Sequence, residues 1–302
     1  MAETELSIIL PCLNESATLP DIVQRLGEMY PDAEIIVVDD GSSPPVSPIG
    51  KARVIRHPRT LGNGAAVKTG VRNARGAYLV FMDTDGQHDP GDIPRLLAAF
   101  DQGYDMVVGA RHPDTHASAG RRYANNLFNR LASLMTGFHI QDLTSGFRAA
   151  RAKTFRNFLY LLPNGFSYPT TSTMAFFRCG YPVAYVPIRA SRREGSSKVR
   201  ILREGIRFFV LILRIGALFS PMRLFLPISI ALFVVGSLWY WYTYATLHQF
   251  TNMGALLYLS SLLTFLFGIL SEQISALHYR FSEERRRSSD DAGSPGKRSG
   301  DR

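Results

Sequence analysis

The sequence predicts an α/β protein with a mostly parallel sheet, followed by a C-terminal hairpin of two transmembrane helices. Continuously apolar segments, such as residues 35–38 and 78–82, alternate with segments of helical spacing, and polar residues follow directly after them. Apolar strands of this kind are typical of parallel sheets that helices cover on both faces. The hairpin is predicted because residues 224–247 and 249–271 contain no charged side chain, and each stretch can cross a hydrocarbon core of about 30 Å.

The elements of the predicted sheet domain follow one another along residues 6–188. Residues 6–14 ("LSIILPCLN") begin as a strand and end as a loop, and the last strand is expected at 182–188. The other strands and helices are expected from the spacing of apolar residues and from the turn-forming residues between them. Strands are expected within 33–45, 53–58, 77–83 and 105–111, and helices within 17–30, 63–76, 92–100 and 167–180. The basic segment 111–137 ends as a helix, and 141–151 is a loop that leads into another element.

The distribution of charge predicts the orientation of the hairpin in the membrane. Arg214 and Arg223 precede it and Arg280 and Arg285 follow it, whereas the joining residues 248–252 ("HQFTN") contain no Lys or Arg. By the positive-inside rule, both ends face the cytoplasm and the turn faces out. The chain is therefore expected in the cytoplasmic (inner) membrane as a multi-pass protein with its N-terminal sheet domain and both termini in the cytoplasm. This anchor accounts for the net charge of +9, so no nucleic-acid partner is expected.

Four regions are predicted along the chain. Residues 1–199 form the cytoplasmic domain, 200–221 form amphipathic interface helices, 222–279 form the hairpin with spans at about 224–247 and 253–275, and 280–302 form a basic, disordered tail. Arginines that recur at intervals of three, four and seven residues within 200–219 share one helical face, which favours a helix in the plane of the membrane interface. An ordinary surface helix packed on the domain is the alternative for this segment, and a pair of buried core helices is the alternative for the hairpin.

Polar residues cluster after four of the predicted strands. In parallel sheets, ligands bind outside the carboxyl ends of the strands, so these residues are expected at one edge and near one another. They are Asn14 and Glu15 after the first strand, Asp39 and Asp40 after the second, Asp83 and Asp85 after residues 77–82, and Arg111 after residues 105–110. Neighbouring carboxylates repel one another unless a cation or a ligand's donors lie between them. The edge therefore predicts a site for a cation together with a ligand.

An Asp-x-Asp sequence at the end of a buried strand favours a divalent metal ion. Asp83 and Asp85 are separated by Thr84, and Gln87 follows. Carboxylate and amide oxygens suit Mg²⁺ or Mn²⁺, and Mg²⁺ usually combines one or two carboxylates with substrate phosphates. Such an ion would offset the charge that develops on a leaving diphosphate. A lone Asp-x-Asp also occurs in many surface turns. Here its expected position on the same edge as Asp39 and Asp40 strengthens the interpretation as a functional site.

Seven segments together resemble one enzyme family. They are "SIILPCLNE", "IIVVDDGSS", "GNGAAVKTG", "VFMDTDGQHDP", "VVGAR", "DLTSGFR" and "RREGSSK", and they run in family order over about the first 200 residues. The chain resembles the inverting family-2 glycosyltransferases, which have the GT-A fold, and within them the polyprenyl-phosphate sugar synthases of the dolichol-phosphate mannose synthase type. The predicted hairpin is similar to that of the multi-span members of the group.

The resemblance implies a function and a set of site residues. It implies transfer of a sugar from a nucleotide-diphosphate sugar, UDP- or GDP-linked, to a polyprenyl phosphate in the bilayer, with Asp83, Asp85 and Arg111 in catalysis and Mg²⁺ or Mn²⁺ held by Asp85 and Gln87. A homo-oligomer is compatible with it. The implied donor-binding residues are Pro11, Leu13, Glu15, Val38, Asp40, Asp83, Thr84, Asp85, Arg111, Arg192 and Lys198. The implied contacts to the acceptor phosphate are Arg121, Arg122, Arg130 and Ser145.

Several of these residues have simpler interpretations. Asp39 or Asp40 can cap a turn, His88 is expected to be a structural residue rather than a ligand, and Lys68 is expected to be solvated. The pair Arg121 and Arg122 can be surface charge. The chain also departs from mannose synthases at Thr84 and Gly86, and has Asn63 where many relatives have Lys, so the resemblance does not carry over the identity of the sugar or the base.

The chemistry of the acceptor explains why no catalytic base stands out. A phosphomonoester has a second pKa near 6, so its attacking oxygen needs no deprotonation at neutral pH, and arginines can hold it in place. An amino-sugar transferase acting on undecaprenyl phosphate is an open alternative. A processive polysaccharide synthase is disfavoured, because relatives of that kind carry a Gln-x-x-Arg-Trp motif on an interface helix. Here the only tryptophans, Trp239 and Trp241, lie in the first span, so the motif is missing. A sugar nucleotidyltransferase is disfavoured, because it would need a glycine-rich loop after the first strand, and the residues there contain no glycine. A non-catalytic membrane scaffold is disfavoured, because the acidic residues Asp83 and Asp85 and the basic residues Arg192 and Lys198 are all present.

Overall fold

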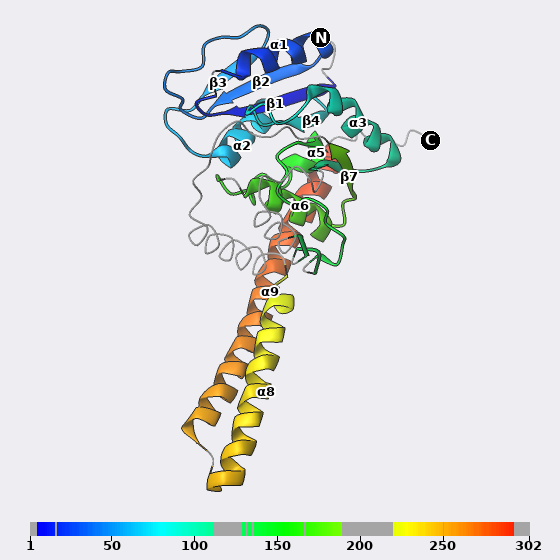
Figure 1. Ribbon diagram of the computed structural model, residues 1–302. Helices are drawn as coiled ribbons and strands as arrows, with labels where there is room; N and C mark the ends of the chain where they lie inside the picture. The colour runs from blue at the N-terminus through cyan, green and yellow to red at the C-terminus, as the bar shows by residue number, and fades with distance from the viewer. Residues whose placement is uncertain are drawn as a thin grey trace, which may run out of the picture. The chain divides into compact units, whose positions relative to one another are not determined.

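The computed structural model describes residues 5–15, 17–111, 129–130, 132–134, 136–165, 167–188, 220–249 and 251–292 (Figure 1). The chain divides into two compact units, Met1–Val199 and Arg200–Arg302. The expected interface helices at 200–219 and the loop at 189–198 lie outside the described residues, as do residues 112–128.

A seven-stranded, mostly parallel sheet forms the first unit, as the sequence predicts. Its strands are β1 (Leu6–Cys12), β2 (Glu34–Asp39), β3 (Arg53–Arg56), β4 (Tyr78–Phe81), β5 (Met106–Arg111), β6 (Arg148–Arg151) and β7 (Val183–Ile188). They lie in the order β3-β2-β1-β4-β6-β5-β7, and only β6 runs antiparallel to its neighbours. The crossovers from β1 to β2 and from β2 to β3 are typical of a parallel α/β sheet.

Strand β6 is the element that the sequence reading missed. Residues 141–151 were expected as a loop leading into another element, and Arg148–Arg151 instead pairs with both β4 and β5. The strand has four residues and the sequence "RAAR", and alanine and arginine give no strand signal. Its partners, which include Val80 opposite Ala149, are distant in the sequence, so tertiary pairing creates this strand.

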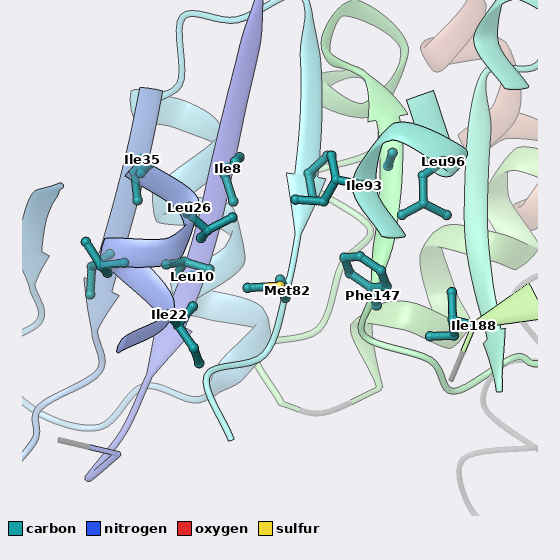
Figure 2. Packing of buried hydrophobic residues seen from close by; sticks show 14 of the residues in the cluster. Ile8, Leu10, Ile22, Leu26, Ile35, Met82, Ile93, Leu96, Phe147 and Ile188 are labelled. Atoms are coloured by element: carbon teal, nitrogen blue, oxygen red, sulfur yellow. The ribbon is translucent and has the colours of Figure 1, made fainter. Parts of the chain in front are cut away.

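Helices cover both faces of the sheet. They are α1 (Leu19–Met29), α2 (Asn63–Asn73), α3 (Ile93–Leu97), α5 (Ala152–Arg156) and α6 (Tyr168–Arg178), with 3-10 turns at Pro90–Asp92 and Ala98–Gln102. Ile8 and Leu10 of β1 pack with Leu26 of α1 in one buried cluster (Figure 2). Ile9 points to the other face, where a Cβ on Gly70 of α2 would lie 2.4 Å from it. Because side chains alternate along a strand, α1 and α2 lie on opposite faces.

One predicted helix is shorter than expected. Residues 92–100 were expected as a helix, and the structure has the single α-helical segment Ile93–Leu97 between two 3-10 turns. Asp89 caps the first turn by accepting a hydrogen bond from the Gly91 N–H at 3.1 Å. Gly103 ends the second turn with φ of 87°, a left-handed conformation that glycine adopts without strain.

The second unit contains the predicted pair of long apolar helices, α8 (Pro221–Leu247) and α9 (Asn252–Ala292). Segments Pro221–Thr246 and Asn252–Leu277 are long and apolar enough to cross a membrane. Ser229 and Ser261 join the helices, since each hydroxyl donates to the other residue's carbonyl, at 3.0 and 2.8 Å. Small residues allow close approach between membrane helices, as at Gly236, where a Cβ would lie 3.2 Å from Leu257.

Helix α9 also corrects the expectation of a disordered tail. It continues to Ala292, whereas disorder was expected throughout 280–302. The residues "SEERRR" at 282–287 are mostly Glu and Arg, which are good helix formers. They also extend an existing helix, so they do not bear the nucleation penalty of an isolated one.

Candidate active site

The carboxyl edge of the sheet collects the charged residues that the sequence placed there. Strands β1 and β2 are in parallel register, with Cys12 opposite Asp39, and β4 runs parallel to β1, with Ile9 opposite Phe81. The segments that follow these strands therefore leave the sheet on the same side. Arg111 ends β5, which joins them through the antiparallel β6.

The carboxylates of Asp39 and Asp40 are occupied by the protein itself. Asp39 is fully buried and accepts hydrogen bonds from the backbone N–H groups of Ser42, at 2.7 Å, and Val46, at 3.2 Å. Burial raises the pKa of Asp39, but these hydrogen bonds and the charge of Arg56 together lower it by more, so the net pKa lies below its usual range. Asp39 is therefore a turn-capping carboxylate.

Asp40, a predicted donor-binding residue, holds the start of α2. Its carboxylate accepts hydrogen bonds from the N–H groups of Leu61 and Gly62 at 2.9 and 2.8 Å, and lies 2.7 Å from His57 Nδ1. The other ring nitrogen of His57 lies 2.8 Å from the Thr69 hydroxyl. The side chain is almost fully buried, so Asp40 positions the loop that leads into α2.

Asp83 lies between α2 and the segment before β6. Its Oδ1 lies 3.5 Å from Asn63 Nδ2, which is at the long limit of a hydrogen bond. On its other side, a Cβ added to Gly146 would lie 2.3 Å from Asp83 Oδ2. Only a glycine at position 146 lets the backbone approach this carboxylate, which is partly exposed.

Asp85 and Gln87 share a tight turn. Asp85 Oδ1 accepts a hydrogen bond from the Gln87 N–H at 3.1 Å, and Gly86 between them has φ of 76°, which a glycine adopts readily. The next residues anchor the turn to α1, because Arg25 forms an ion pair of 2.8 Å with Asp89. The turn thus presents the Asp85 carboxylate and the Gln87 amide, both partly exposed, from a supported loop.

Thr84 is fully buried, and its hydroxyl is hydrogen-bonded to the Glu15 carboxylate. Its hydroxyl donates to the Glu15 carboxylate and to the Pro11 carbonyl, the latter at 3.0 Å, and its own carbonyl accepts from Thr18 at 2.5 Å. Among the other predicted donor contacts, Pro11 is buried and Val38 is fully buried, whereas Leu13 is 39% exposed.

Arg111 is fixed by Asp142, a residue that the sequence reading did not select. Its Nε and Nη2 donate to the two carboxylate oxygens of Asp142 at 2.8 and 3.0 Å, and Nη2 also donates to the Thr144 hydroxyl at 2.7 Å. Burial lowers the pKa of Arg111, but Asp142 and then Asp83 and Asp85 raise it above its usual value. The guanidinium is therefore a positive charge that Asp142 and Thr144 hold in a fixed position at the end of β5.

His88 is buried and packs against the ring of Phe147. It stacks on Phe147 with 5.1 Å between ring centroids, and its Nδ1 is buried without a hydrogen-bond partner among the described residues. Burial lowers the pKa of His88 below its usual value, and the opposing effects of Asp83 and Asp85 are smaller.

The predicted acceptor contacts are only partly described. Arg130 is exposed. Ser145 is buried, and its hydroxyl lies 3.4 Å from the Phe147 carbonyl. The Ser145 carbonyl accepts two hydrogen bonds from the fully buried Arg148, which also donates to Pro169, Ser172 and Thr173. Predicted residues outside the described part of the chain are Arg121, Arg122, Arg192 and Lys198.

The donor set suits a metal ion that is shared with a substrate. In the part of the chain that the structure describes, no group of three or more His, Cys, Asp or Glu side chains forms a complete metal site. Asp83, Asp85 and Gln87 supply oxygen atoms from a partly exposed turn. Hard cations with incomplete protein shells bind in this way, with phosphate oxygens completing the coordination, so these residues fit Mg²⁺ or Mn²⁺.

The fold and the site together define the class of protein. A mostly parallel sheet with an Asp-x-Asp turn and an opposing arginine at its carboxyl edge is the arrangement of a GT-A glycosyltransferase. A solved structure of glucosyl-3-phosphoglycerate synthase from Mycobacterium tuberculosis, in complex with Mn²⁺, uridine-diphosphate and phosphoglyceric acid, has the same fold. Its TM-score is 0.55 at 21% identity, over 71% of this chain and 78% of that one.

Sequence comparisons give the family. Residues 7–159 match Glycosyl transferase family 2, and residues 220–277 match the GtrB C-terminal hairpin. The chain belongs to glycosyl transferase family 2 and is a glycosyltransferase, which confirms the resemblance. The hairpin match and the two apolar helices make it membrane-associated.

Two relatives carry informative names. Undecaprenyl-phosphate 4-deoxy-4-formamido-L-arabinose transferase of Pseudomonas fluorescens (strain Pf0-1) is 30% identical over 254 residues, which are 77% of this chain and 70% of that enzyme. Polyprenol monophosphomannose synthase of Mycolicibacterium smegmatis is 30% identical over 211 residues, which are 64% of this chain and 80% of that enzyme. The match to the arabinose transferase of Pseudomonas aeruginosa (strain LESB58) spans 61% of that relative.

Proposed function

We propose that this enzyme transfers a sugar, with inversion, from a nucleotide-diphosphate sugar to a polyprenyl phosphate in the membrane. The observation that carries the proposal is that Asp83 and Asp85 follow β4 and Arg111 ends β5 in one sheet, with Arg111 held by Asp142 in a bidentate ion pair. This edge offers oxygen ligands for a cation and a fixed guanidinium for phosphate. The names of the relatives and the membrane hairpin support a lipid-linked acceptor.

The acidic turn binds the donor in this proposal. Asp85 and Gln87 hold Mg²⁺ or Mn²⁺ together with the diphosphate, and Asp83 faces the nucleoside sugar. The ion supplies positive charge that stabilises the leaving diphosphate. Arg111 adds a second positive charge at a fixed place, and a preorganised charge of this kind lowers the barrier without rearrangement during the reaction. The predicted pair Arg192 and Lys198 would close over the same diphosphate.

The acceptor needs orientation rather than a catalytic base. A phosphomonoester is mostly dianionic at neutral pH, because its second pKa is about 6. The enzyme therefore has only to hold one oxygen in line with the anomeric carbon. Arg121, Arg122, Arg130 and Ser145 are the proposed contacts to this phosphate, and the burial of Ser145 means that its hydroxyl reaches a ligand only after a local movement.

The proposed topology places the catalytic unit and both termini in the cytoplasm. The basic residues that flank the hairpin support this orientation, and it brings a water-soluble donor to a lipid acceptor. A second candidate is transfer of an amino sugar to undecaprenyl phosphate, which the name of the Pseudomonas fluorescens relative favours. Both candidates share the site and the acceptor, and they differ only in the donor sugar.

The test is transfer of radiolabelled sugar into a chloroform-soluble product. Full-length protein in detergent micelles is supplied with a polyprenyl phosphate, Mg²⁺ or Mn²⁺, and in turn UDP-glucose, GDP-mannose or a UDP-linked amino arabinose. We expect one donor to be used, chelation to abolish transfer, and Asp85→Ala to reduce it by at least about 100-fold. Absence of lipid-linked label with all donors, or wild-type turnover by Asp85→Ala with metal still required, would refute the proposal.

A further inference from the structure

The side chain of Asn63, the first residue of α2, contains a buried oxygen without a hydrogen-bond donor. Asn63 Oδ1 has no partner among the described residues, while Nδ2 lies 3.5 Å from Asp83 Oδ1. Exchanging the two amide atoms, which look alike in most structures, does not help, because it would place the oxygen against a carboxylate. Buried polar atoms are nearly always paired, so this one calls for a partner that the described residues do not provide.

The backbone around Asn63 is held on two sides, so the amide cannot turn away through a loop shift. Asp40 accepts hydrogen bonds from the N–H groups of the two preceding residues, at 2.9 and 2.8 Å. On the other side, the Asn164 carbonyl accepts from the Ala65 N–H at 3.0 Å. The same carbonyl lies 2.4 Å from the place of a Cβ on Gly62. The unpaired oxygen is therefore built into the fold.

Lys68 reinforces this arrangement one turn along α2. Its ammonium group donates to the Leu162 carbonyl at 3.1 Å and to the Asn164 side chain at 2.5 Å, where the sequence reading expected a solvated residue. Residues 163–165 pack closely against α2, as Gly64 shows: a Cβ at this position would lie 2.1 Å from the Pro163 carbonyl oxygen. Residues 163–165 thus hold the first turn of α2, and with it Asn63, in place.

We propose that Asn63 Oδ1 accepts a hydrogen bond from a hydroxyl group of the bound sugar nucleotide, so that Asn63 and Asp83 together recognise a vicinal diol. The inference rests on the proposed function, because it assigns a further contact in the same site. The cation is already assigned to Asp85 and Gln87 in the proposed function, so the partner of this amide oxygen is an O–H or N–H donor. The diphosphate is excluded, because its ionised oxygens only accept hydrogen bonds. Two neighbouring acceptors suit two neighbouring hydroxyls, and both the ribose and the transferred sugar carry such a pair.

The proposal predicts that replacing Asn63 weakens donor binding without lowering the stability of the free protein, whereas replacing an asparagine with a purely structural role lowers stability. Replacing an asparagine that is fully hydrogen-bonded lowers the stability of the free protein. Replacing Asn63 with leucine instead removes an unpaired buried oxygen, so the unfolding temperature of the ligand-free enzyme should stay the same or rise. Binding of the donor should nevertheless weaken, by about tenfold, because the ligand hydroxyl loses its acceptor.

Asn73, near the end of the same helix, provides the matched control. Both of its amide atoms have partners: Nδ2 donates to the Thr69 carbonyl at 2.9 Å, and Oδ1 accepts from Arg53 at 3.0 Å. Asn73→Leu should therefore lower the unfolding temperature and leave donor affinity unchanged. Asn63→Ala is included as a smaller replacement, because leucine could be too large for the site.

The experiment measures binding by calorimetry and thermal unfolding on the full-length protein in detergent with Mn²⁺. The probes are UDP, GDP and the sugar nucleotide that supports transfer. Weaker binding of both the nucleoside diphosphate and the sugar nucleotide by the Asn63 variants assigns the diol to ribose, and weaker binding of the sugar nucleotide alone assigns it to the transferred sugar. Either result, with stability retained, supports the inference.

Two other outcomes overturn it. Donor affinity within twofold of wild type in both Asn63 variants would show that the oxygen meets no ligand group. Loss of affinity with a fall in unfolding temperature as large as that of Asn73→Leu would show a structural role instead. Both outcomes leave the proposed function intact as long as wild type binds the sugar nucleotide, whereas a wild-type protein that binds none of the probes refutes the proposed function itself.

Discussion

Gly146→Ala should inactivate the enzyme by displacing one carboxylate, with little effect on the fold. The added Cβ would lie 2.3 Å from Asp83 Oδ2 and 3.0 Å from its Cγ, whereas ordinary contact begins at 3.4 Å. The carboxylate must therefore move by about 1 Å. A displacement of this size in a reacting site reduces the rate by about 100-fold, and the strain of overpacking costs about 1–3 kcal/mol of stability.

The assay is kcat/KM for the donor sugar nucleotide, with circular dichroism and thermal unfolding as checks of folding. Gly165→Ala is the control, because a Cβ at that position meets no atom within 4 Å. We expect the control to keep activity within about twofold of wild type. If folded Gly146→Ala protein retains more than about one third of wild-type kcat/KM, the position of Asp83 does not limit the reaction, and the role given to that carboxylate is wrong.

Three further changes test the supports of the site and of the hairpin. Asp142→Asn leaves the partly buried Arg111 without its ion-pair partner and should cost about 3 kcal/mol in urea denaturation; an effect under about 1 kcal/mol would contradict the pairing. Burial raises the pKa of Asp142, but hydrogen bonding and attraction from Arg111 lower it by more, so the net pKa lies below its usual range. The stabilisation is therefore complete above about pH 3.9 and is lost as the pH falls through the lower folded pKa. Urea titrations at decreasing pH should show a larger loss in wild type than in Asp142→Asn, in which other carboxylates such as Asp39 still titrate. Lys68→Met should speed hydrogen exchange in the first turn of α2, because Asn164 loses its ammonium partner, and unchanged exchange would exclude that anchor. Ser261→Ala should cost about 0.6 kcal/mol in detergent-induced unfolding, and Ser261→Leu considerably more; equal effects would argue against close packing at this contact.

The general fold could be predicted because it depends on local patterns. Apolar runs such as residues 35–38, and the charge-free stretches of the hairpin, carry their signal within a few residues or a few turns. The antiparallel strand β6 has no such signal, since its sequence "RAAR" forms a strand only between β4 and β5. The extension of α9 to Ala292 was missed for a related reason: a basic segment without apolar periodicity predicted a disordered tail, whereas its Glu and Arg residues are good helix formers.

Part of the candidate site could also be predicted from local sequence patterns. Asp83, Asp85 and Arg111 stand at the ends of recognisable strands, so the order of elements placed them on one edge. Asp142 could not be selected, because its significance is its pairing with Arg111, 31 residues away. Gly146 is similar, since its importance lies in the approach of Asp83, which the sequence alone does not reveal.

The four aspartates at the edge of the sheet differ in how much of their hydrogen-bonding capacity the protein uses. Asp39 accepts from two backbone N–H groups, and Asp40 accepts from two more and pairs with His57. Both are buried, so their charge is already compensated and a ligand would have to break existing bonds to reach them.

Asp83 and Asp85 are partly exposed, and among the described residues their carboxylates accept one hydrogen bond each, of 3.5 and 3.1 Å. Carboxylates have capacity for about four hydrogen bonds, so most of theirs is unused. Unused capacity on a supported turn favours a cation or a polar ligand. By this argument the sequence pair "DD" at 39–40 organises the loops. We propose that Asp83 and Asp85 meet the substrate, and that Asp40 contributes to the donor site only through the position that it gives Asn63.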